Sequence, residues 1–130
     1  LTDEQGRMVL CDSAHNPAGA RVLADYLREV HPGGLPIVFG IMKDKDVSGT
    51  LTPLLPWASH LVVTRAHTDR ALTPDSLAKA ARRAGWRGTV EIEEEPAIAL
   101  EAAWRHAPAI CAAGSIFLVG EVLARLRHDT

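Results

Sequence analysis

Short apolar runs alternate along the chain with longer segments in which apolar residues recur every three or four positions. The runs are typical of buried strands, and they cover residues 8–11, 36–39, 61–64 and 115–119. Residues 89–92 alternate apolar and polar positions instead, which predicts a strand at the edge of a sheet.

The longer segments predict helices. They cover residues 17–30, 47–55, 74–84, the stretch after Pro96 and residues 120–128. In the first of them the predicted buried stripe consists of Ala20, Leu23, Ala24, Leu27 and Val30. In the stretch after Pro96 the recurring apolar positions are Ala97, Leu100, Ala103 and Trp104. Asn16-Pro17 and Thr73-Pro74 combine a capping side chain with proline at the first helical position, so they predict two helix starts.

The resulting order is five strands, each followed by a helix, within 130 residues. Because crossovers between parallel strands are right-handed, this order predicts one α/β domain with a mostly parallel sheet of five to six strands and helices on both faces. Neither Gly-x-Gly-x-x-Gly nor Gly-x-x-x-x-Gly-Lys-[Ser/Thr] occurs in the chain, so the two best-known phosphate cradles of such folds are missing.

Composition narrows the class of protein further. An apolar content of 47% with 23% charged residues excludes a disordered chain. A net charge of −2 argues against a partner bound by bulk charge such as nucleic acid, and no apolar run is long enough to predict a membrane span. Cys11 and Cys111 lie far apart in apolar stretches, which favours free thiols in a reducing cytoplasm.

Residues 12–17 (Asp-Ser-Ala-His-Asn-Pro) are the sharpest candidate for chemistry. They follow the first predicted strand, and open α/β sheets bind ligands at the carboxyl ends of their strands. Asp12 can accept hydrogen bonds from ribose hydroxyls or from water on Mg²⁺, and His15 can donate to a phosphate or a carboxylate. A turn capped by Asp12, with His15 as a surface residue, explains the same pattern equally well.

Two further loops are predicted to lie on the same edge. In residues 43–46 (Lys-Asp-Lys-Asp), Lys43 or Lys45 can meet a phosphate or a carboxylate and Asp46 can cap the next helix, although a solvated turn is the simpler interpretation. In residues 65–70, Arg70 can bind a carboxylate with two hydrogen bonds, or make an ordinary surface ion pair.

The pair His67 and Asp69 suggests a metal site, but no third ligand has suitable spacing, so we predict none. The acidic residues 93–95 are interpreted as the start of a helix, favoured by its dipole.

Residues 12–17 resemble the Asp-Gly-Ala-His-Asn-Pro motif of folylpolyglutamate and dihydrofolate synthases, members of the Mur ligase superfamily, with Ser13 in place of the common glycine. Three more stretches are similar to that family in the same order. They are residues 39–46 (Phe-Gly-Ile-Met-Lys-Asp-Lys-Asp), 70–74 (Arg-Ala-Leu-Thr-Pro) and 114–120 (Gly-Ser-Ile-Phe-Leu-Val-Gly), the last resembling a closing strand. The resemblance covers essentially the whole chain.

This resemblance implies a Rossmann-like C-terminal domain, residues 1–130, of a longer enzyme whose preceding ATPase domain is not in the sequence. Such enzymes use ATP and Mg²⁺ to add L-glutamate to a folate acceptor through an acyl phosphate, so the domain alone is expected to be inactive. By position, Asp12 matches an ATP-binding aspartate, His15 a histidine at the reaction centre, and Ser115 a serine associated with the incoming glutamate. A cytoplasmic monomer is the expectation.

Other classes remain as alternatives. The same superfamily includes ligases for peptidoglycan precursors and cyanophycin, but their typical motifs differ from residues 12–17. A non-catalytic flavodoxin-like binding module or a pure interaction domain is more distant, because the chain lacks an acidic cluster after the first strand and a Ser/Thr/Gly-rich phosphate loop.

Overall fold

One five-stranded sheet forms the centre of the part that the computed structural model describes, namely residue 2 and residues 5–128. The strands are β1 (Met8–Asp12), β2 (Leu35–Phe39), β3 (Ala58–Val63), β4 (Val90–Ile92) and β5 (Ala109–Ala113). Their order across the sheet is β1-β5-β2-β3-β4, and every neighbouring pair is parallel. The predicted parallel sheet is therefore confirmed, with β4 at an edge as its alternating pattern indicated.

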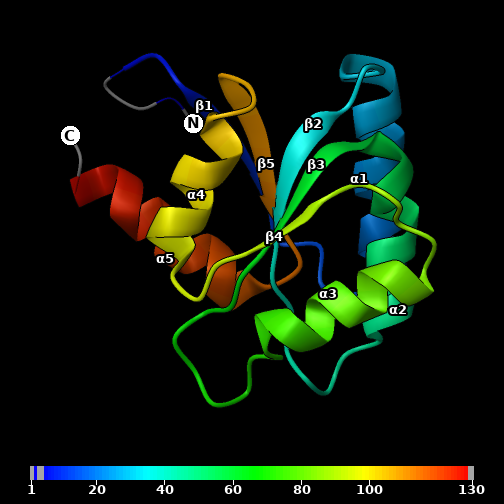
Figure 1. Ribbon diagram of the computed structural model, residues 1–130. Coiled ribbons are helices and arrows are strands. Elements are labelled where there is room, and N and C mark those ends of the chain that lie inside the picture. Colours follow the sequence, from blue (N-terminus) through cyan, green and yellow to red (C-terminus); the bar gives the residue numbers. More distant parts are fainter. Residues whose placement is uncertain (1, 3–4, 129–130) are drawn as a thin grey trace.

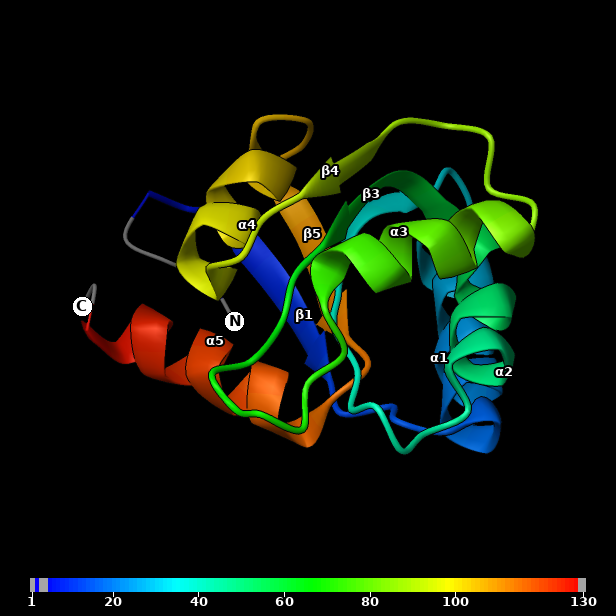
Figure 2. The same cartoon turned by 60° about the horizontal axis from the view of Figure 1, so that its bottom comes forward.

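Helices cover both faces of this sheet, as the views in Figure 1 and Figure 2 show. They are α1 (Pro17–Val30), α2 (Val47–Leu51), the 3₁₀ helix η1 (Thr52–Trp57), α3 (Pro74–Arg83), α4 (Pro96–Trp104) and α5 (Ile116–His128). The helices α1, α2 and α3 lie on one face, while α4 and α5 lie on the other (Figure 2). This arrangement confirms the three-layer α/β/α fold. No helix among residues 5–128 is both long and apolar enough to cross a membrane.

Each face of the sheet has its own apolar core, because successive side chains of a strand point to opposite faces. On one face, Ile37 and Phe39 of β2 pack with Leu23 of α1. On the other face, Val38 of β2 packs with residues such as Leu118. Burial on both faces explains why the central strands are apolar at nearly every position.

The predicted helix caps are present. Asn16 Oδ1 accepts a 2.8 Å hydrogen bond from the Gly19 amide at the start of α1, and Thr73 Oγ1 accepts one of 3.3 Å from Ser76 at the start of α3. Asp46 Oδ1 caps α2 by accepting from the Gly49 amide at 2.9 Å. These caps fix where three of the loops at the carboxyl edge end and their helices begin.

The prediction of a strand at residues 115–119 is wrong. Ser115 precedes α5 and residues 116–119 form its first turn, while the fifth strand is Ala109–Ala113. An unbroken apolar run does not distinguish a strand from a helix. Ser115 caps the helix instead, and residues such as Leu118 and Val122 continue a buried helical stripe, while Ile116 and Phe117 stay exposed. The strand was missed because its alanines are weak strand formers.

Smaller predictions also need correction. Val30 is half exposed at the end of α1 and does not belong to the buried stripe. The helix predicted at residues 47–55 is α2 followed by η1, in which Pro53 and Pro56 cannot donate the hydrogen bonds of a continuous α-helix. The helix predicted at residues 120–128 starts earlier, at Ile116.

The two thiols are free, as predicted, and the sheet protects them. Burial raises the pKa of Cys111 to about 12 and also raises that of Cys11, which is only half buried. Because the thiolate is the reactive form, we expect Cys111 not to react with a thiol reagent at pH 8 while the chain is folded, and Cys11 to react slowly. A colorimetric thiol titration checks this, with both thiols reacting in denaturant as the control. Two rapidly reacting thiols in the folded chain would contradict it.

Candidate functional site

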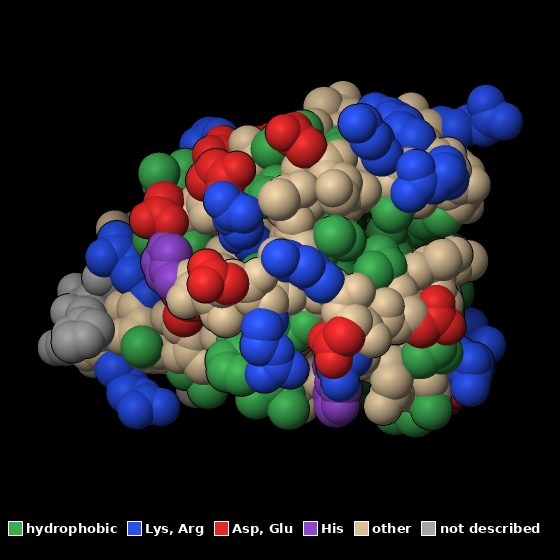
Figure 3. Space-filling model, turned by 90° about the horizontal axis from the view of Figure 1, so that it is seen from below, with side chains coloured by type: hydrophobic (Ala, Val, Ile, Leu, Met, Phe, Trp, Pro, Cys, Tyr) green, Lys and Arg blue, Asp and Glu red, His purple; other side chains and the backbone are tan. Residues whose placement is uncertain are grey.

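All the loops that follow the strands meet at one edge of the sheet, because the strands are parallel. This carboxyl edge lies at the bottom of Figure 1 and faces the viewer in Figure 3. Basic side chains run across the middle of this face, with acidic side chains beside them and an apolar area between (Figure 3). The polar candidates predicted from the sequence therefore share one surface.

Four of the predicted residues line one hollow of about 200 Å³, which we call the rim hollow. Its lining residues are His15, Met42, Lys45, Arg70, Ser115, Ile116 and Phe117. These residues come from the loops after β1, β2, β3 and β5, so segments distant in the sequence converge here. The hollow combines cations with an apolar wall, a combination suited to a small ligand that carries carboxylate or phosphate groups.

The loop after β1 orients His15. Asp12 Oδ1 accepts a 2.8 Å hydrogen bond from the Ala14 amide, which closes a tight turn. The ring Nδ1 of His15 then lies 2.8 Å from the carbonyl oxygen of Ser13. Since a carbonyl only accepts, Nδ1 is the protonated nitrogen in this contact, and Nε2 remains available to a ligand.

Ser115 has a structural task in addition to its place in the hollow. Its side chain is buried, and Oγ accepts hydrogen bonds from the amides of Phe117 at 3.1 Å and Leu118 at 3.3 Å. It is therefore the N-cap of α5. The hydroxyl proton of such a cap is still able to donate to a ligand in the hollow.

We expect Ser115→Ala to lower the free energy of unfolding by about 1 kcal/mol, because two amides at the start of α5 lose their acceptor. The matched control is Ser48→Ala on the exposed face of α2, for which we expect less than about 0.5 kcal/mol. Urea unfolding of the two variants measures the difference. Equal stability of both variants would show that the cap contributes nothing.

Arg70 is held at the surface by its neighbours. Its guanidinium carbon lies 5.6 Å from the ring centroid of Phe117, and its carbonyl oxygen accepts a 2.8 Å hydrogen bond from the Lys43 amide. No ion pair to an acidic side chain is found for Arg70 or Lys45 in the described part of the chain. Both cations are thus available to an anionic ligand.

Asp12 and Lys43 lie outside the rim hollow. Asp12 ends β1 beside the hollow, and Lys43 lines two adjoining depressions instead. The smaller depression, of about 280 Å³, contains Arg70 as well as Lys43, so the two areas are continuous. The structure therefore groups four of the six predicted residues and places the other two at its border.

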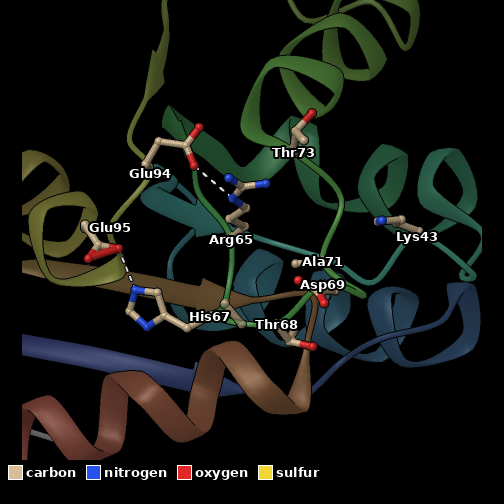
Figure 4. A pocket seen from close by; sticks show the side chains of 10 residues that line it. Lys43, Arg65, His67, Thr68, Asp69, Ala71, Thr73, Glu94 and Glu95 are labelled. Atoms are coloured by element: carbon tan, nitrogen blue, oxygen red, sulfur yellow. Dashed lines mark hydrogen bonds and ion pairs between the residues drawn. The ribbon is translucent and has the colours of Figure 1, made fainter.

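The larger depression, of about 700 Å³, lies between the loops after β2, β3 and β4 (Figure 4). Here Arg65 Nε pairs with Glu94 at 2.8 Å, and His67 Nε2 pairs with Glu95 at 2.5 Å. The sequence suggests a pair of His67 with Asp69 and predicts a helix start at residues 93–95, so it does not predict these two ion pairs. Adjacent parallel strands β3 and β4 bring the two loops together, and that pairing was the missing signal. Among the described residues, no three His, Cys, Asp or Glu side chains converge as metal ligands.

Together, the three-layer fold and the polar carboxyl edge define a Rossmann-like α/β domain whose rim carries the cations Lys45 and Arg70. Comparison with known proteins then gives the family. The profile named "Mur ligase, glutamate ligase domain" matches residues 1–119, so the chain belongs to the Mur ligase family through this domain.

Relatives within this family are folate enzymes by name. A probable bifunctional folylpolyglutamate synthase/dihydropteroate synthase of Halobacterium salinarum is 35% identical over 121 residues, covering 91% of this chain and 15% of the relative. The solved folylpolyglutamate synthase of Thermotoga maritima is 32% identical, with a TM-score of 0.84 over all of this chain and 30% of that one.

The Mycobacterium tuberculosis folylpolyglutamate synthase, solved with ADP and AMPPCP, is 31% identical, with a TM-score of 0.83 over 91% of this chain and 29% of that one. The chain thus spans less than a third of the length of each of these relatives.

Proposed function

We propose that this chain is the C-terminal domain of a longer ATP-dependent ligase that adds L-glutamate to a folate-type acceptor. The observation that carries the proposal is the rim hollow, where His15, Lys45, Arg70 and Ser115 converge from four loops. Membership of the Mur ligase family and the folate enzymes among the similar chains support the same activity. We propose further that the longer enzyme is a cytoplasmic monomer that binds neither nucleic acid nor a membrane.

The residues present fit a nucleotide at the border of the hollow. One carboxylate oxygen of Asp12 is engaged by the Ala14 amide, which fixes the group and leaves the other oxygen to accept from ribose hydroxyls. The similar Mycobacterium tuberculosis protein was solved with ADP and AMPPCP, which supports a nucleotide as a ligand of the longer protein. We propose that ATP, with Mg²⁺, supplies the phosphoryl group that activates the acceptor carboxylate, and that a preceding ATPase domain holds most of the triphosphate.

The hollow itself suits the incoming amino acid. L-Glutamate carries two carboxylates, and the unpaired cations Lys45 and Arg70 can bind them, Arg70 with two parallel hydrogen bonds. The Ser115 hydroxyl can donate a further hydrogen bond. With Nδ1 of His15 fixed on the Ser13 carbonyl, Nε2 is the ring nitrogen left to a ligand in the hollow. In the neutral form it can take a proton from the ammonium group of L-glutamate, whose free amine then attacks the acyl phosphate. In the protonated form it can donate a hydrogen bond to the phosphate.

Closure of this domain over the ATPase domain would exclude water from the reaction. An activated acyl group hydrolyses readily, so its protection requires a lid that assembles the site only when substrates are bound. The exposed side chains of Ile116 and Phe117, at 59% and 49% exposure, supply apolar surface beside the cations for this purpose.

The experiment that tests the proposal compares three proteins in an ATP-dependent assay with radiolabelled L-glutamate and a reduced folate. They are the longer protein, the same protein lacking this chain, and this chain alone. We expect turnover only in the first. Equal turnover without this chain would contradict a role for the rim hollow, and turnover by this chain alone would contradict the need for an ATPase domain.

A further inference from the structure

His67 is clamped between two helices by three contacts. Its ring Nε2 lies 2.5 Å from Glu95 at the start of α4, and its ring Nδ1 is paired with Glu121 of α5. Its backbone amide also donates a 2.7 Å hydrogen bond to Glu121 Oε2. The residue belongs to the loop between β3 and α3, so this cluster, which we call the His67 latch, ties that loop to the other layer of the domain (Figure 4).

The two ring contacts require the protonated form of the imidazole. A carboxylate only accepts hydrogen bonds, and a histidine has two N–H donors only when it carries a positive charge. In the neutral form one ring nitrogen presents a lone pair to a carboxylate oxygen, so that contact becomes repulsive. Hydrogen bonding to Glu95, then the negative charge of Glu121, raises the pKa of His67 above the ordinary value of 6.5.

Several elements around His67 contribute charged side chains. Besides Glu95 and Glu121, the charged side chains that share its two depressions are Lys43, Arg65, Asp69, Glu94 and Arg125. Arg65 is paired with Glu94, which reduces the effect of both on the imidazole. The two carboxylates in direct contact therefore dominate the local field.

The latch also separates two parts of the surface. His67 and Glu95 line both the large depression of about 700 Å³ and a smaller one of about 280 Å³ on the side of α5. Farther along the same loop, Arg70 lines the rim hollow. In the first half of the loop Arg65 is also paired with Glu94 and Ala66 is buried, so the latch acts on residues 67–69. The second half is bound to the loop after β2 through the Lys43 amide and the Arg70 carbonyl oxygen.

We propose that the His67 latch is a proton-operated device that fixes residues 67–69 of the β3–α3 loop against α4 and α5 when the imidazole is charged and loosens them when the imidazole is neutral. The folded pKa is raised, so the latch is fully closed below about pH 6.5 and opens as the pH rises through the pKa of the folded state. Rising pH would then join the two depressions beside the rim. This proposal does not depend on which substrate the enzyme uses.

Nuclear magnetic resonance of the 130-residue chain tests the latch without any substrate. We expect the His67 imidazole to titrate above pH 6.5, with the amide signals of residues 65–69 and Glu121 following the same midpoint. Across that midpoint we expect the protection of the His67 amide against hydrogen exchange, corrected for the intrinsic rate, to fall roughly two- to fivefold, as suits an exposed ion pair.

Variants give the test a matched comparison. Glu121→Gln keeps an oxygen for the His67 amide but removes the charge, so the His67 midpoint should move down toward 6.5. Glu29→Gln removes the same charge from the exposed face of α1 and should leave the midpoint unchanged. A wild-type midpoint at or below 6.5, loop amides that do not follow it, or equal effects of the two variants would overturn the proposal.

Discussion

Replacing His15 with alanine is expected to lower kcat/KM of the longer ligase about 100- to 1,000-fold while the domain stays folded. His15 is half buried in the rim hollow, and its Nδ1 is fixed on the Ser13 carbonyl, so only Nε2 can act on a ligand. Removing one oriented group that meets developing charge costs about this much in enzymes where it has been measured. Steady-state kinetics with the folate acceptor, alongside thermal melting of the variant, measure both parts of the prediction.

Two further variants make this result interpretable. His15→Gln places an amide near the position of Nε2, so partial recovery of activity would indicate hydrogen bonding, and none would indicate proton transfer. His31→Ala, at the C-terminal end of α1 and away from the rim, is the control and should keep full activity. Wild-type kcat/KM in His15→Ala would remove His15 from the site.

Replacing Gly114 with alanine is expected to destabilise the domain by about 3 kcal/mol and lower Tm by roughly 10 °C. Gly114 links β5 to α5 with φ at +110°, a conformation that side chains disfavour. An added Cβ would collide with the carbonyl oxygen of Gly40 and lie 2.8 Å from the Phe39 ring. The backbone and the packed ring cannot both move away, because β2 and β5 are neighbours in the sheet.

The control for this prediction is Gly120→Ala within α5. Nothing lies within 4 Å of the Cβ that this substitution adds, and alanine favours a helix, so stability should rise by up to about 1 kcal/mol. Thermal and urea unfolding of the two variants should therefore change in opposite directions. A Gly114→Ala domain as stable as the parent would contradict the close approach of Gly114 to Gly40 in the loop after β2.

Local patterns predicted most of the fold because they have strong physical causes. The caps at Asn16 and Thr73 mark helix starts, and the proline after each cap strengthens the prediction. Buried runs such as residues 36–39 contain no polar position, which predicts a strand covered on both faces. The strand at residues 109–113 was missed and residues 115–119 were wrongly predicted as a strand, because two apolar segments lie next to each other. Only the left-handed turn at Gly114 and the cap at Ser115 separate them, and neither is visible in apolar content.

The candidate site was predictable as a set of loops but not as a set of contacts. A parallel sheet places His15, Lys45 and Arg70 on one edge, and the order of the strands then decides which of them meet. A strand at residues 115–119 would have put Ser115 at the opposite edge, and Ser115 joins the others because it follows β5 instead. Strand order is a tertiary property, so the sequence did not separate Lys43 from Lys45. The same limit applies to the His67 latch, whose partners come from α4 and α5.

The most direct test of the central claim is the acceptor specificity of the longer protein. Dihydropteroate, a reduced folate and a UDP-muramyl acceptor are offered side by side with ATP and radiolabelled L-glutamate. We expect turnover with at least one of the two pterin acceptors, and the acceptor used shows which folate step the enzyme serves. Turnover with the muramyl acceptor alone would contradict the folate assignment and place the protein in the cell-wall branch of the family. No turnover with any acceptor would contradict the proposed activity altogether.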